Sequence, residues 1–312
     1  MKIGVLSRNG ALYSTRRLLE AGRQRGHTML LIDTLGVVVD MGRAEGDGDL
    51  KRVSKQAVLG GLAYPYVQLP QVDAIVPRIG ASITDYGLAV VRQFEAKAVP
   101  TVASSLGIGS SRDKLHSLQL MSQAGLPVPK TAVLAQPHLY FSAVRAVGGP
   151  PVIIKLNQST QGRGVILAPN YRTVEVVVSR LRRLKQLLLA QEFVAEAEGR
   201  DLRVIVVGGR CVAAMQRIAS DGEYRSNLHR GGTAVAISVS PDISRLARRA
   251  AQVHQLDVAG VDIIQSKRGP LLLEVNSSPG LEGIEQATQV DVAAAIIEYL
   301  ERKAAQKAGP RA

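Results

Sequence analysis

Short apolar runs alternate with longer amphipathic stretches along the first hundred residues, and no other feature constrains the fold as much. The apolar runs are predicted strands, and the stretches between them are predicted helices. The strands cover residues 3–6, 29–32, 72–76 and 100–102, and the helices cover residues 13–25 and 86–98. Neighbouring parallel strands need a crossover connection, which is usually a helix. Residues 1–103 are therefore predicted to form an α/β domain whose parallel sheet is flanked by helices.

The pattern changes after residue 103. A middle stretch contains predicted helices at 113–124 and 173–185 and predicted strands at 151–156, 164–167 and 187–194. Later residues favour antiparallel strands, at 201–207, 211–217, 235–237, 261–265 and 271–276, covered by helices at 243–255 and 290–303. We expect α/β structure followed by α+β structure, with subdomains at 104–189 and 190–303. Residues 304–312 form a basic tail that we expect to fray.

Composition excludes several classes of protein. With 312 residues, 46% of them hydrophobic, the chain is long and apolar enough for two or three packed units. A single cysteine excludes an intrachain disulfide, and no Cys/His cluster suggests zinc. Aromatic residues make up only 4%, which argues against base-stacking platforms and sequence-specific nucleic-acid binding. No apolar stretch approaches the ~20 residues that span a bilayer, and the first residues lead directly into a strand, so we expect a cytoplasmic protein without a membrane segment.

The formal net charge is +13, from 39 basic and 26 acidic residues. Such an excess attracts polyanions, which include nucleotides, nucleic acid, ribosomes and acidic peptides. The charge by itself does not choose among these partners.

Residues 260–276 are predicted to form a β-hairpin that carries a metal site. A three-residue loop, 267–269, would put glycine where a left-handed conformation is needed. That loop places Asp262 opposite Glu274, and Asn276 lies on the same face as Glu274. Two facing carboxylates repel each other unless a cation lies between them, and oxygen ligands without Cys or His favour Mg²⁺ or Mn²⁺. The alternative is the polar edge of a solvated sheet, although the apolar neighbours indicate burial.

Two lysines are candidates for binding phosphate. Lys155 ends an apolar strand and precedes the hydroxyl- and glycine-rich loop 159–164, whose backbone N–H groups could enclose phosphate oxygens. Lys114 lies near the start of a predicted helix. The loop has neither the Walker A spacing nor the dinucleotide spacing. A glycine-rich hairpin turn and a surface lysine would give the same pattern.

Three further segments suit a nucleotide. Residues 191–194 resemble a strand whose backbone could hydrogen-bond an adenine edge. Asp201 and Arg203 alternate, which places them on one face of a strand. Residues 225–232 form a polar stretch with donors suited to phosphate and to an acidic co-substrate.

In this order the segments resemble the ATP-grasp superfamily and, within it, the RimK-type glutamate ligases. The resemblance runs from about residue 2 to residue 303 and is most specific at residues 1–10, 77–80, 225–232, 259–262 and 274–285. It implies an ATP-grasp fold preceded by a Rossmann-like pre-ATP-grasp domain.

The resemblance also implies roles for individual residues. Those implied to contact ATP are Lys114 and Lys155 at the phosphates, Glu192, Phe193 and Val194 at the adenine, Asp201 at the ribose, and Arg225, Ser226 and Asn227. Those implied to bind two Mg²⁺ or Mn²⁺ ions are Asp262, Glu274 and Asn276. Arg217 would stabilise the transferring phosphoryl group. Residues 157–159 depart from the family pattern, which has an acidic residue and a glycine there.

The implied reaction joins L-glutamate to the C-terminal carboxylate of a protein or peptide, through an acyl phosphate, with ADP and phosphate as products. The implied acceptor is a small-subunit ribosomal protein, and we expect a homo-oligomer. The segment 40–68 is longer than in the nearest relatives and, like the basic tail, could alter the choice of acceptor.

Three alternatives remain open at this point. One is a ligase that acts on a small molecule or a carrier protein. Another is a non-catalytic ribosome- or RNA-binding protein attracted by the positive charge. The third is a nicotinamide dehydrogenase, for which only Gly10 follows the first strand.

Overall fold

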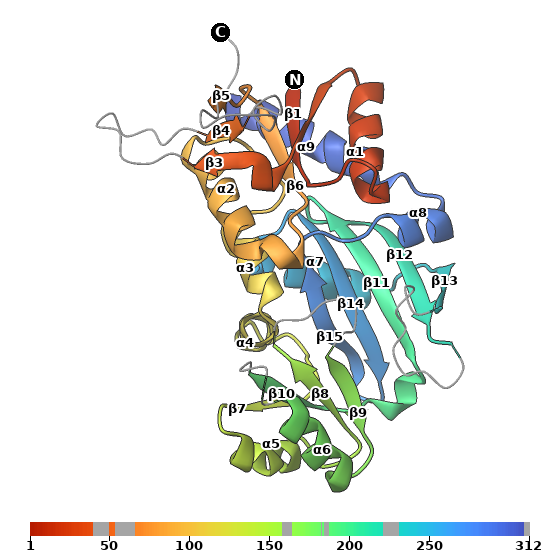
Figure 1. The fold of residues 1–312 in the computed structure, drawn as a ribbon. Coiled ribbons are helices and arrows are strands. Elements are labelled where there is room, and N and C mark those ends of the chain that lie inside the picture. Colours follow the sequence, from red (N-terminus) through yellow and green to blue (C-terminus); the bar gives the residue numbers. More distant parts are fainter. Residues whose placement is uncertain are drawn as a thin grey trace.

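The computed structural model describes residues 1–39, 50–53, 66–157, 164–181, 183, 187–220 and 231–308. Four sheets organise these residues: two three-stranded sheets, one of four strands and one of five strands. Figure 1 shows the four-stranded sheet at one end of the molecule, the amino-terminal domain at the other, and the five-stranded sheet between them. Short 3-10 helices occupy Thr34–Gly36, Ala81–Ile83, Pro137–Leu139 and Ala195–Ala197.

The amino-terminal domain is built on the predicted parallel sheet. Its strands are β1 (Lys2–Leu6), β2 (Thr28–Ile32) and β6 (Ala74–Pro77), in the order β2-β1-β6. Helices α1 (Tyr13–Gln24) and α2 (Thr84–Ala96) follow β1 and β6. The predicted strand at 100–102 is reduced to a single bridge between Ile75 and Thr101. Because β2 and β6 lie on opposite sides of β1, the carboxyl ends of β1 and β6 form a topological switch point, where open α/β sheets bind ligands.

A small antiparallel sheet, which the sequence did not predict, lies beside this domain. It consists of β3 (Val37–Val39), β4 (Leu50–Val53) and β5 (Tyr66–Gln68). Most of the segment 40–68 lies outside the described residues.

The middle region forms a four-stranded antiparallel sheet. Its strands β7 (Thr131–Leu134), β8 (Val152–Leu156), β9 (Val165–Ala168) and β10 (Leu188–Glu192) lie in the order β7-β10-β8-β9. Helices α5 (Tyr140–Ala146) and α6 (Tyr171–Leu181) share a core with this sheet. The boundary expected at 189/190 falls inside β10, because the strand pairs with β7 and β8 over its whole length. Helix α6 is predicted to reach residue 185; the structure describes it to Leu181, and residues 182, 184 and 185 lie outside the described part of the chain.

Two consecutive helices connect the amino-terminal domain to this sheet. Helix α3 (Ser105–Arg112) was not predicted, because Gly107 and Gly109 weaken the helical pattern. Gly107 is needed for packing, since a Cβ there would lie 2.6 Å from the backbone oxygen of His254. Helix α4 (Lys114–Gln123) lies close to the prediction.

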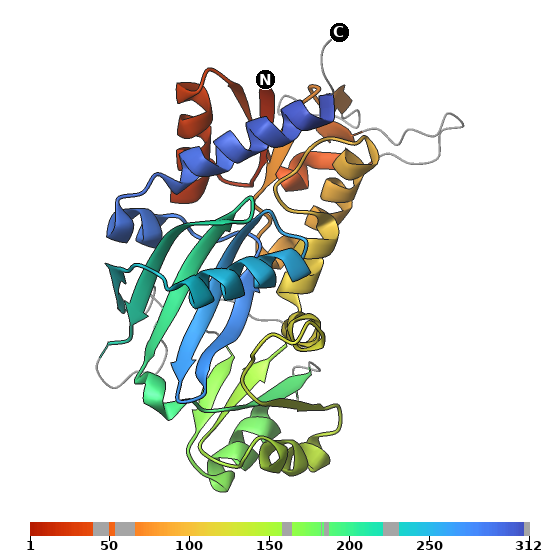
Figure 2. The ribbon, with the colours of Figure 1, turned by 180° about the vertical axis from the view of Figure 1, so that it is seen from behind.

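The large sheet is antiparallel and has the order β13-β12-β11-β14-β15. Its strands are β11 (Arg200–Val207), β12 (Arg210–Ile218), β13 (Thr233–Ala236), β14 (Val258–Ser266) and β15 (Gly269–Asn276). Helix α7 (Pro241–Val253) covers one face, and α8 (Glu282–Thr288) and α9 (Val292–Ala308) cover the other (Figure 2).

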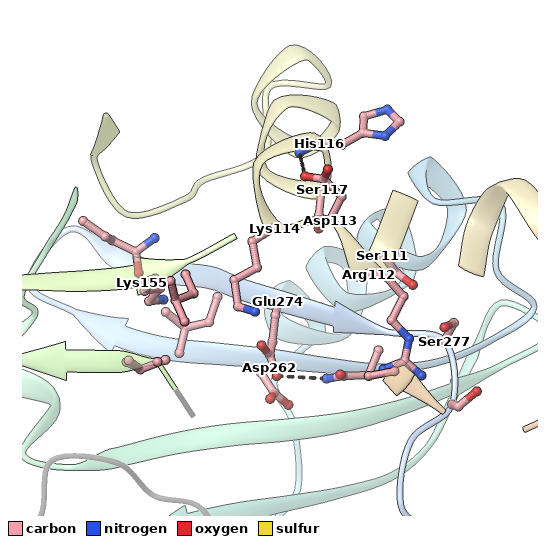
Figure 3. A pocket seen from close by; sticks show the side chains of 18 of the residues that line it. Ser111, Arg112, Asp113, Lys114, His116, Ser117, Lys155, Asp262, Glu274 and Ser277 are labelled. Carbon is pink, nitrogen blue, oxygen red and sulfur yellow. Dashed lines mark hydrogen bonds between the residues drawn. The ribbon is translucent and has the colours of Figure 1, made fainter. Parts of the chain in front are cut away.

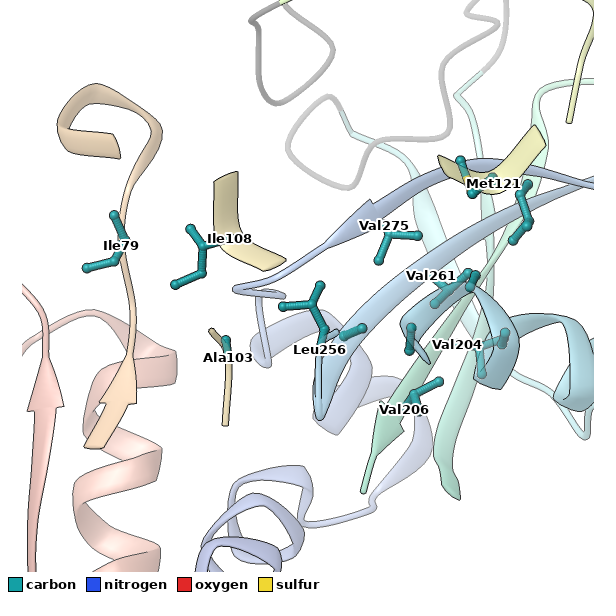
Figure 4. Close-up of a cluster of buried hydrophobic side chains, with 14 of the residues drawn as sticks. Ile79, Ala103, Ile108, Met121, Val204, Val206, Leu256, Val261 and Val275 are labelled. Atoms are coloured by element: carbon teal, nitrogen blue, oxygen red, sulfur yellow. The ribbon is translucent and has the colours of Figure 1, made fainter. Parts of the chain in front are cut away.

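The large sheet is buried on both faces. Along its strands, apolar residues follow one another without alternating with polar ones, so both faces are apolar. Val204 and Val206 belong to the core beneath α7, whereas the intervening Ile205 belongs to the core beneath α9. Figure 4 shows that the first core continues from Val206 through Ile108 of α3 to Ile79 of the amino-terminal domain. The amino-terminal domain and the large sheet therefore share one hydrophobic core.

Helix α9 corrects the prediction of a frayed tail. The helix continues through residues 304–308, and it packs against α1. Lys303 fixes the helix by donating to Asp257 Oδ2 at 2.5 Å and to the backbone oxygen of Thr101 at 2.9 Å. Residues 309–312 lie outside the described part of the chain. None of the described helices is long and apolar enough to span a membrane.

Candidate active site

A cavity of about 1170 Å³ lies between the four-stranded and five-stranded sheets, with α4 and the start of α2 at its wall. Ten of the predicted site residues line it: Lys114, Lys155, Glu192, Phe193, Val194, Asp201, Arg217, Asp262, Glu274 and Asn276. Arg225, Ser226 and Asn227 lie outside the described residues, as does the phosphate loop up to residue 163. Segments as far apart in the sequence as Leu35 and Ser278 therefore contribute to one cavity.

The β14–β15 hairpin places Asp262 opposite Glu274, as predicted, but by a different route. Ser266 pairs with Gly269, so the turn has two residues where three were expected. Gly269 does adopt a left-handed conformation, with φ of +101°. A β-bulge between Asp262 and Ile263 then shifts the register by one residue. Without the bulge, Glu274 would pair with Val261. A one-residue change of register turns side chains to the other face of the sheet, so Glu274 would no longer face Asp262.

Asp262 is the centre of a buried ion-pair cluster. It accepts hydrogen bonds from Arg203 Nε at 2.8 Å and Nη2 at 2.7 Å, and from Arg217 Nη2 at 2.9 Å. Arg217 also binds both carboxylate oxygens of Asp201. Burial alone would raise the pKa of Asp262, but Arg203 and Arg217 outweigh it and hold the pKa well below its usual range. Arg203 is thus committed to Asp262 and is not available for a substrate carboxylate.

Glu274 faces a different environment, although it lies directly across from Asp262 (Figure 3). Its Oε1 accepts a hydrogen bond from Asn276 Nδ2 at 3.2 Å. Its negative charge raises the pKa of three basic groups, Arg112, Lys114 and Lys155, and so opposes the effect of their burial. Several cations therefore surround one carboxylate, an excess of positive charge that suits a polyanion.

Lys155 is held by a chain of polar side chains. Its Nζ donates to Gln191 Oε1 at 2.5 Å, and Gln191 Nε2 donates to Thr131 Oγ1 at 2.8 Å. Burial, and to a lesser extent the charge of Lys114, lowers the pKa of Lys155 to about 8. Sequence reasoning used only the backbone around Gln191 and missed this side chain. The signal was a buried glutamine in an otherwise apolar strand.

Lys114 is positioned by the amino-terminal end of α4. Asp113 caps this helix by accepting from the backbone N–H of His116 at 2.9 Å. Asn157, which directly follows β8, accepts from the backbone N–H of Leu115 at 2.8 Å. Asn157 therefore connects the helix that carries Lys114 to the strand that carries Lys155.

Two family models match the chain. The model of the RimK PreATP-grasp domain matches residues 1–108, and that of the RimK-like ATP-grasp domain matches residues 111–300. The chain belongs to the RimK-like ATP-grasp family. This is a family of ligases, and the ATP-grasp fold with its pre-ATP-grasp domain is the one that the sequence resemblance implied.

Relatives of this RimK-like chain carry similar names. A "Probable alpha-L-glutamate ligase" of Marinomonas sp. (strain MWYL1) is 49% identical over 97% of this chain and 96% of the relative. A protein of the same name from Cellvibrio japonicus is 48% identical, with the same coverage. Among solved structures, the ATP-grasp ligase PsnB complexed with a minimal precursor has a TM-score of 0.72 at 20% identity, and covers 97% of this chain and 98% of its own. A RimK domain protein from Sphaerobacter thermophilus has a TM-score of 0.69 at 20% identity, covering 96% and 100%. These structures share the fold.

The ATP-grasp chain has oxygen donors for a metal, but they are not equivalent. Within the described residues, no group of three or more His, Cys, Asp and Glu side chains could hold an ion. The donor set is therefore two carboxylates and the amide of Asn276. Arginines take three of the roughly four acceptor positions of Asp262. Glu274 and Asn276 consequently fit a divalent cation better than Asp262, since Mg²⁺ commonly needs only one or two carboxylates besides substrate phosphates and water.

The strand predicted to hold adenine is β10, and its last residue already makes several contacts within and around the four-stranded sheet. The Glu192 carboxylate accepts from the backbone N–H of Lys130 at 2.8 Å and forms an ion pair with Arg268. The backbone N–H of Glu192 donates to Lys130 as well. Phe193 and Val194 leave the strand and line the cavity. Backbone groups that reach a base would therefore come from these two residues and not from Glu192.

Proposed function

We propose that this protein is an ATP- and Mg²⁺-dependent ligase that joins L-glutamate to the C-terminal carboxylate of a protein or peptide. The observation that carries the proposal is the set of cations around Glu274, from α3, α4 and β8, in a cavity of about 1170 Å³. A metal triphosphate would supply the missing negative charge. The names of relatives almost half identical over nearly the whole chain support L-glutamate as the amine.

In this proposal the cavity residues hold and neutralise the nucleotide. Lys114 and Lys155 contact the phosphates, and Phe193 and Val194 hold the adenine. Glu274 and Asn276 would hold Mg²⁺, the latter through its amide oxygen. Asp262 joins them if a second ion binds, and Mn²⁺ can replace Mg²⁺ because both prefer oxygen ligands.

The proposed chemistry has two steps. An oxygen of the acceptor carboxylate attacks the γ-phosphorus of ATP, ADP leaves, and an acyl phosphate forms. The amino group of glutamate then attacks the acyl carbon, and phosphate leaves as the amide forms. Bound Mg²⁺ would offset charge on the phosphates, and Lys155 and Arg217 would stabilise the charge that develops during transfer. Because Arg217 already binds Asp201 and Asp262, its orientation is fixed before the substrate arrives.

The acceptor is proposed to be a protein terminus, and the net charge of +13 suits an acidic or ribosome-associated one. The test combines the protein with ATP, Mg²⁺ and labelled glutamate. Acidic peptides, small carboxylates and a ribosomal protein extract serve as acceptors in parallel, and products are read by intact mass. We expect mass increments of whole glutamate residues on peptides or proteins, with one ADP per increment. Incorporation only into small carboxylates, or none alongside normal ATP binding, would contradict the proposed acceptor.

The proposal includes a homo-oligomer, which light scattering of the purified protein measures directly. A mass equal to that of a single 33.3 kDa chain at working concentration would contradict it.

A further inference from the structure

Arg112, one of the cations around Glu274, lies with a further arginine where the amino-terminal domain meets the large sheet. Leu6 and Pro77 are register partners at the carboxyl ends of β1 and β6, and Arg78 directly follows β6. This is the switch point of the parallel sheet, where a ligand crevice is expected. The loop after β15 closes the crevice from the other side, since Ser278 Oγ contacts the backbone oxygen of Pro77 at 3.5 Å.

Arg112 and Arg78 bring two guanidinium groups to this place. Arg112 Nη2 donates to the backbone oxygen of Ile79 at 2.5 Å, so the end of α3 is fixed beside Arg78. Burial and, to a lesser extent, the charge of Arg112 lower the pKa of Arg78 to about 10. Among the described residues, the buried Nε of Arg112 has no hydrogen-bond partner. Two like charges at close range, one with an unused donor, are stabilised by an anion.

Ser277 supplies an independent sign of a ligand. Its side chain is only 5% exposed, and its hydroxyl has no hydrogen-bond partner among the described residues. Buried polar groups are nearly always paired, so an unpaired one at a cavity wall calls for an explanation. Ser277 and Arg112 line the cavity, and Figure 3 shows Arg112 extending toward the loop of Ser277, on the side of Glu274 away from Lys155.

We propose that Arg112 and Ser277, backed by Arg78, form a subsite for a carboxylate of one of the two substrates. A guanidinium fork matches the planar carboxylate, and the serine hydroxyl adds a third donor. The position favours a substrate over the nucleotide, because Lys155, the proposed phosphate-binding lysine, lies on the opposite side of Glu274. A carboxylate here would lie beside the transferring phosphoryl group, next to the metal-binding end of β15. The subsite rests on the proposed ligase function and identifies where the enzyme holds a carboxylate of its substrate.

The test measures binding, so it does not depend on turnover. Arg112→Lys and Arg78→Lys each keep the positive charge but remove the forked guanidinium group. Ser277→Ala removes one hydroxyl. Equilibrium dialysis with ADP and Mg²⁺ present follows labelled L-glutamate and, separately, a labelled acidic peptide. We expect about tenfold weaker binding of one of them to Arg112→Lys, a several-fold loss for Ser277→Ala, and ADP affinity within twofold of the wild type.

Analogues identify the carboxylate that occupies the subsite. The α-amide and γ-amide of glutamate, and the peptide amidated at its C-terminus, each lack one acid group. The wild type should discriminate against one of these amides, and Arg112→Lys should lose that discrimination. Arg245→Lys and Ser122→Ala, on the exposed faces of α7 and α4, are controls and should bind as the wild type does.

Equal binding of glutamate and peptide to the wild type and to all three folded variants would overturn the subsite, as would a loss confined to ADP. A wild type that binds these ligands through the subsite but joins nothing with ATP would instead contradict the proposed ligase function. The two failures are therefore distinguishable.

Discussion

The two carboxylates of the β14–β15 hairpin are paired in register but have opposite surroundings. Asp262 lies in a buried cluster with Arg203, Arg217 and Asp201, in which each charge already has a partner. Glu274 has an amide beside it and the basic groups of Arg112, Lys114 and Lys155 nearby, without a matching set of acids. The comparison indicates that the charge of Asp262 is neutralised within the fold, whereas Glu274 lies among cations that suit a polyanion.

The first prediction tests the Glu274 side. Glu274→Ala should lower Mg²⁺-dependent ADP formation by about 10²–10³-fold or more, because it removes the carboxylate best placed for the cation. Thermal unfolding should change less than in Asp262→Ala, because Glu274 lies near buried cations but is not a member of the ion-pair cluster around Asp262. Glu282→Ala, an exposed carboxylate on α8, is the matched control and should leave turnover unchanged. Undiminished turnover in Glu274→Ala would mean that the metal lies elsewhere.

The second prediction tests the Asp262 side through stability. Asp262→Ala should lower the free energy of unfolding by about 3–5 kcal/mol, because it leaves Arg203 and part of Arg217 buried without their counter-charge. Urea unfolding measures the change, and coincident fluorescence and circular dichroism transitions check that unfolding is two-state. A loss below about 1 kcal/mol would show that the cluster is not structural, and the contrast with Glu274 would then disappear.

The third prediction concerns pH. Lys155 has a pKa of about 8, below the ordinary 10.5, so its charge is present at neutral pH and is lost as the pH rises through 8. The affinity for ATP should therefore fall about tenfold between about pH 7 and pH 9. Its effect on stability has the opposite sign: between pH 8 and 10.5 the unfolded chain binds more protons at this group, so this contribution favours folding as the pH rises.

Lys155→Arg is the matched variant for the pH experiment. Arginine keeps its charge over the whole range, so the pH dependence of ATP affinity should flatten. An equally steep fall in Lys155→Arg would assign the titration to another group.

The smallest expected effect concerns Asn157, which connects the two lysine-bearing elements. Asn157→Ala should cost about 1 kcal/mol of stability, as the loss of a bond at a helix terminus does, and should raise the KM for ATP several-fold. Asn170→Ala is a matched control, because the Asn170 side chain likewise accepts a backbone N–H, that of Thr173 at the start of α6. It should cost similar stability without changing the KM. Equal KM values in both variants would limit Asn157 to a structural role.

Much of the fold was predictable from local pattern. Burial of one or both faces leaves a pattern in the sequence. Apolar runs predict strands β1 and β2 and the large antiparallel sheet, and an amphipathic stretch predicts helix α1. The hairpin was predicted with the correct facing pair but with the wrong turn length, and the bulge that corrected the register has no local signature in the sequence.

The missed features depend on contacts between distant segments. Helix α3 carries two glycines, one of which is required by the approach of residue 254, more than a hundred residues away. Gln191 is an unremarkable residue until the sheet places it beside Lys155. Arg112 and Ser277 have no motif that marks them as a pair, since they lie 165 residues apart in the sequence.

The sequence by itself determined the family, most of the order of strands and helices, and the types of residue that are candidates for phosphate cations and metal donors. These depend on side-chain chemistry and on periodicities of two and 3.6 residues, both of which are local. Only the tertiary structure decided which charges neutralise one another. Coulomb energies depend on distance and burial, and two carboxylates that look alike in the sequence differ because arginines from neighbouring strands reach Asp262 and not Glu274.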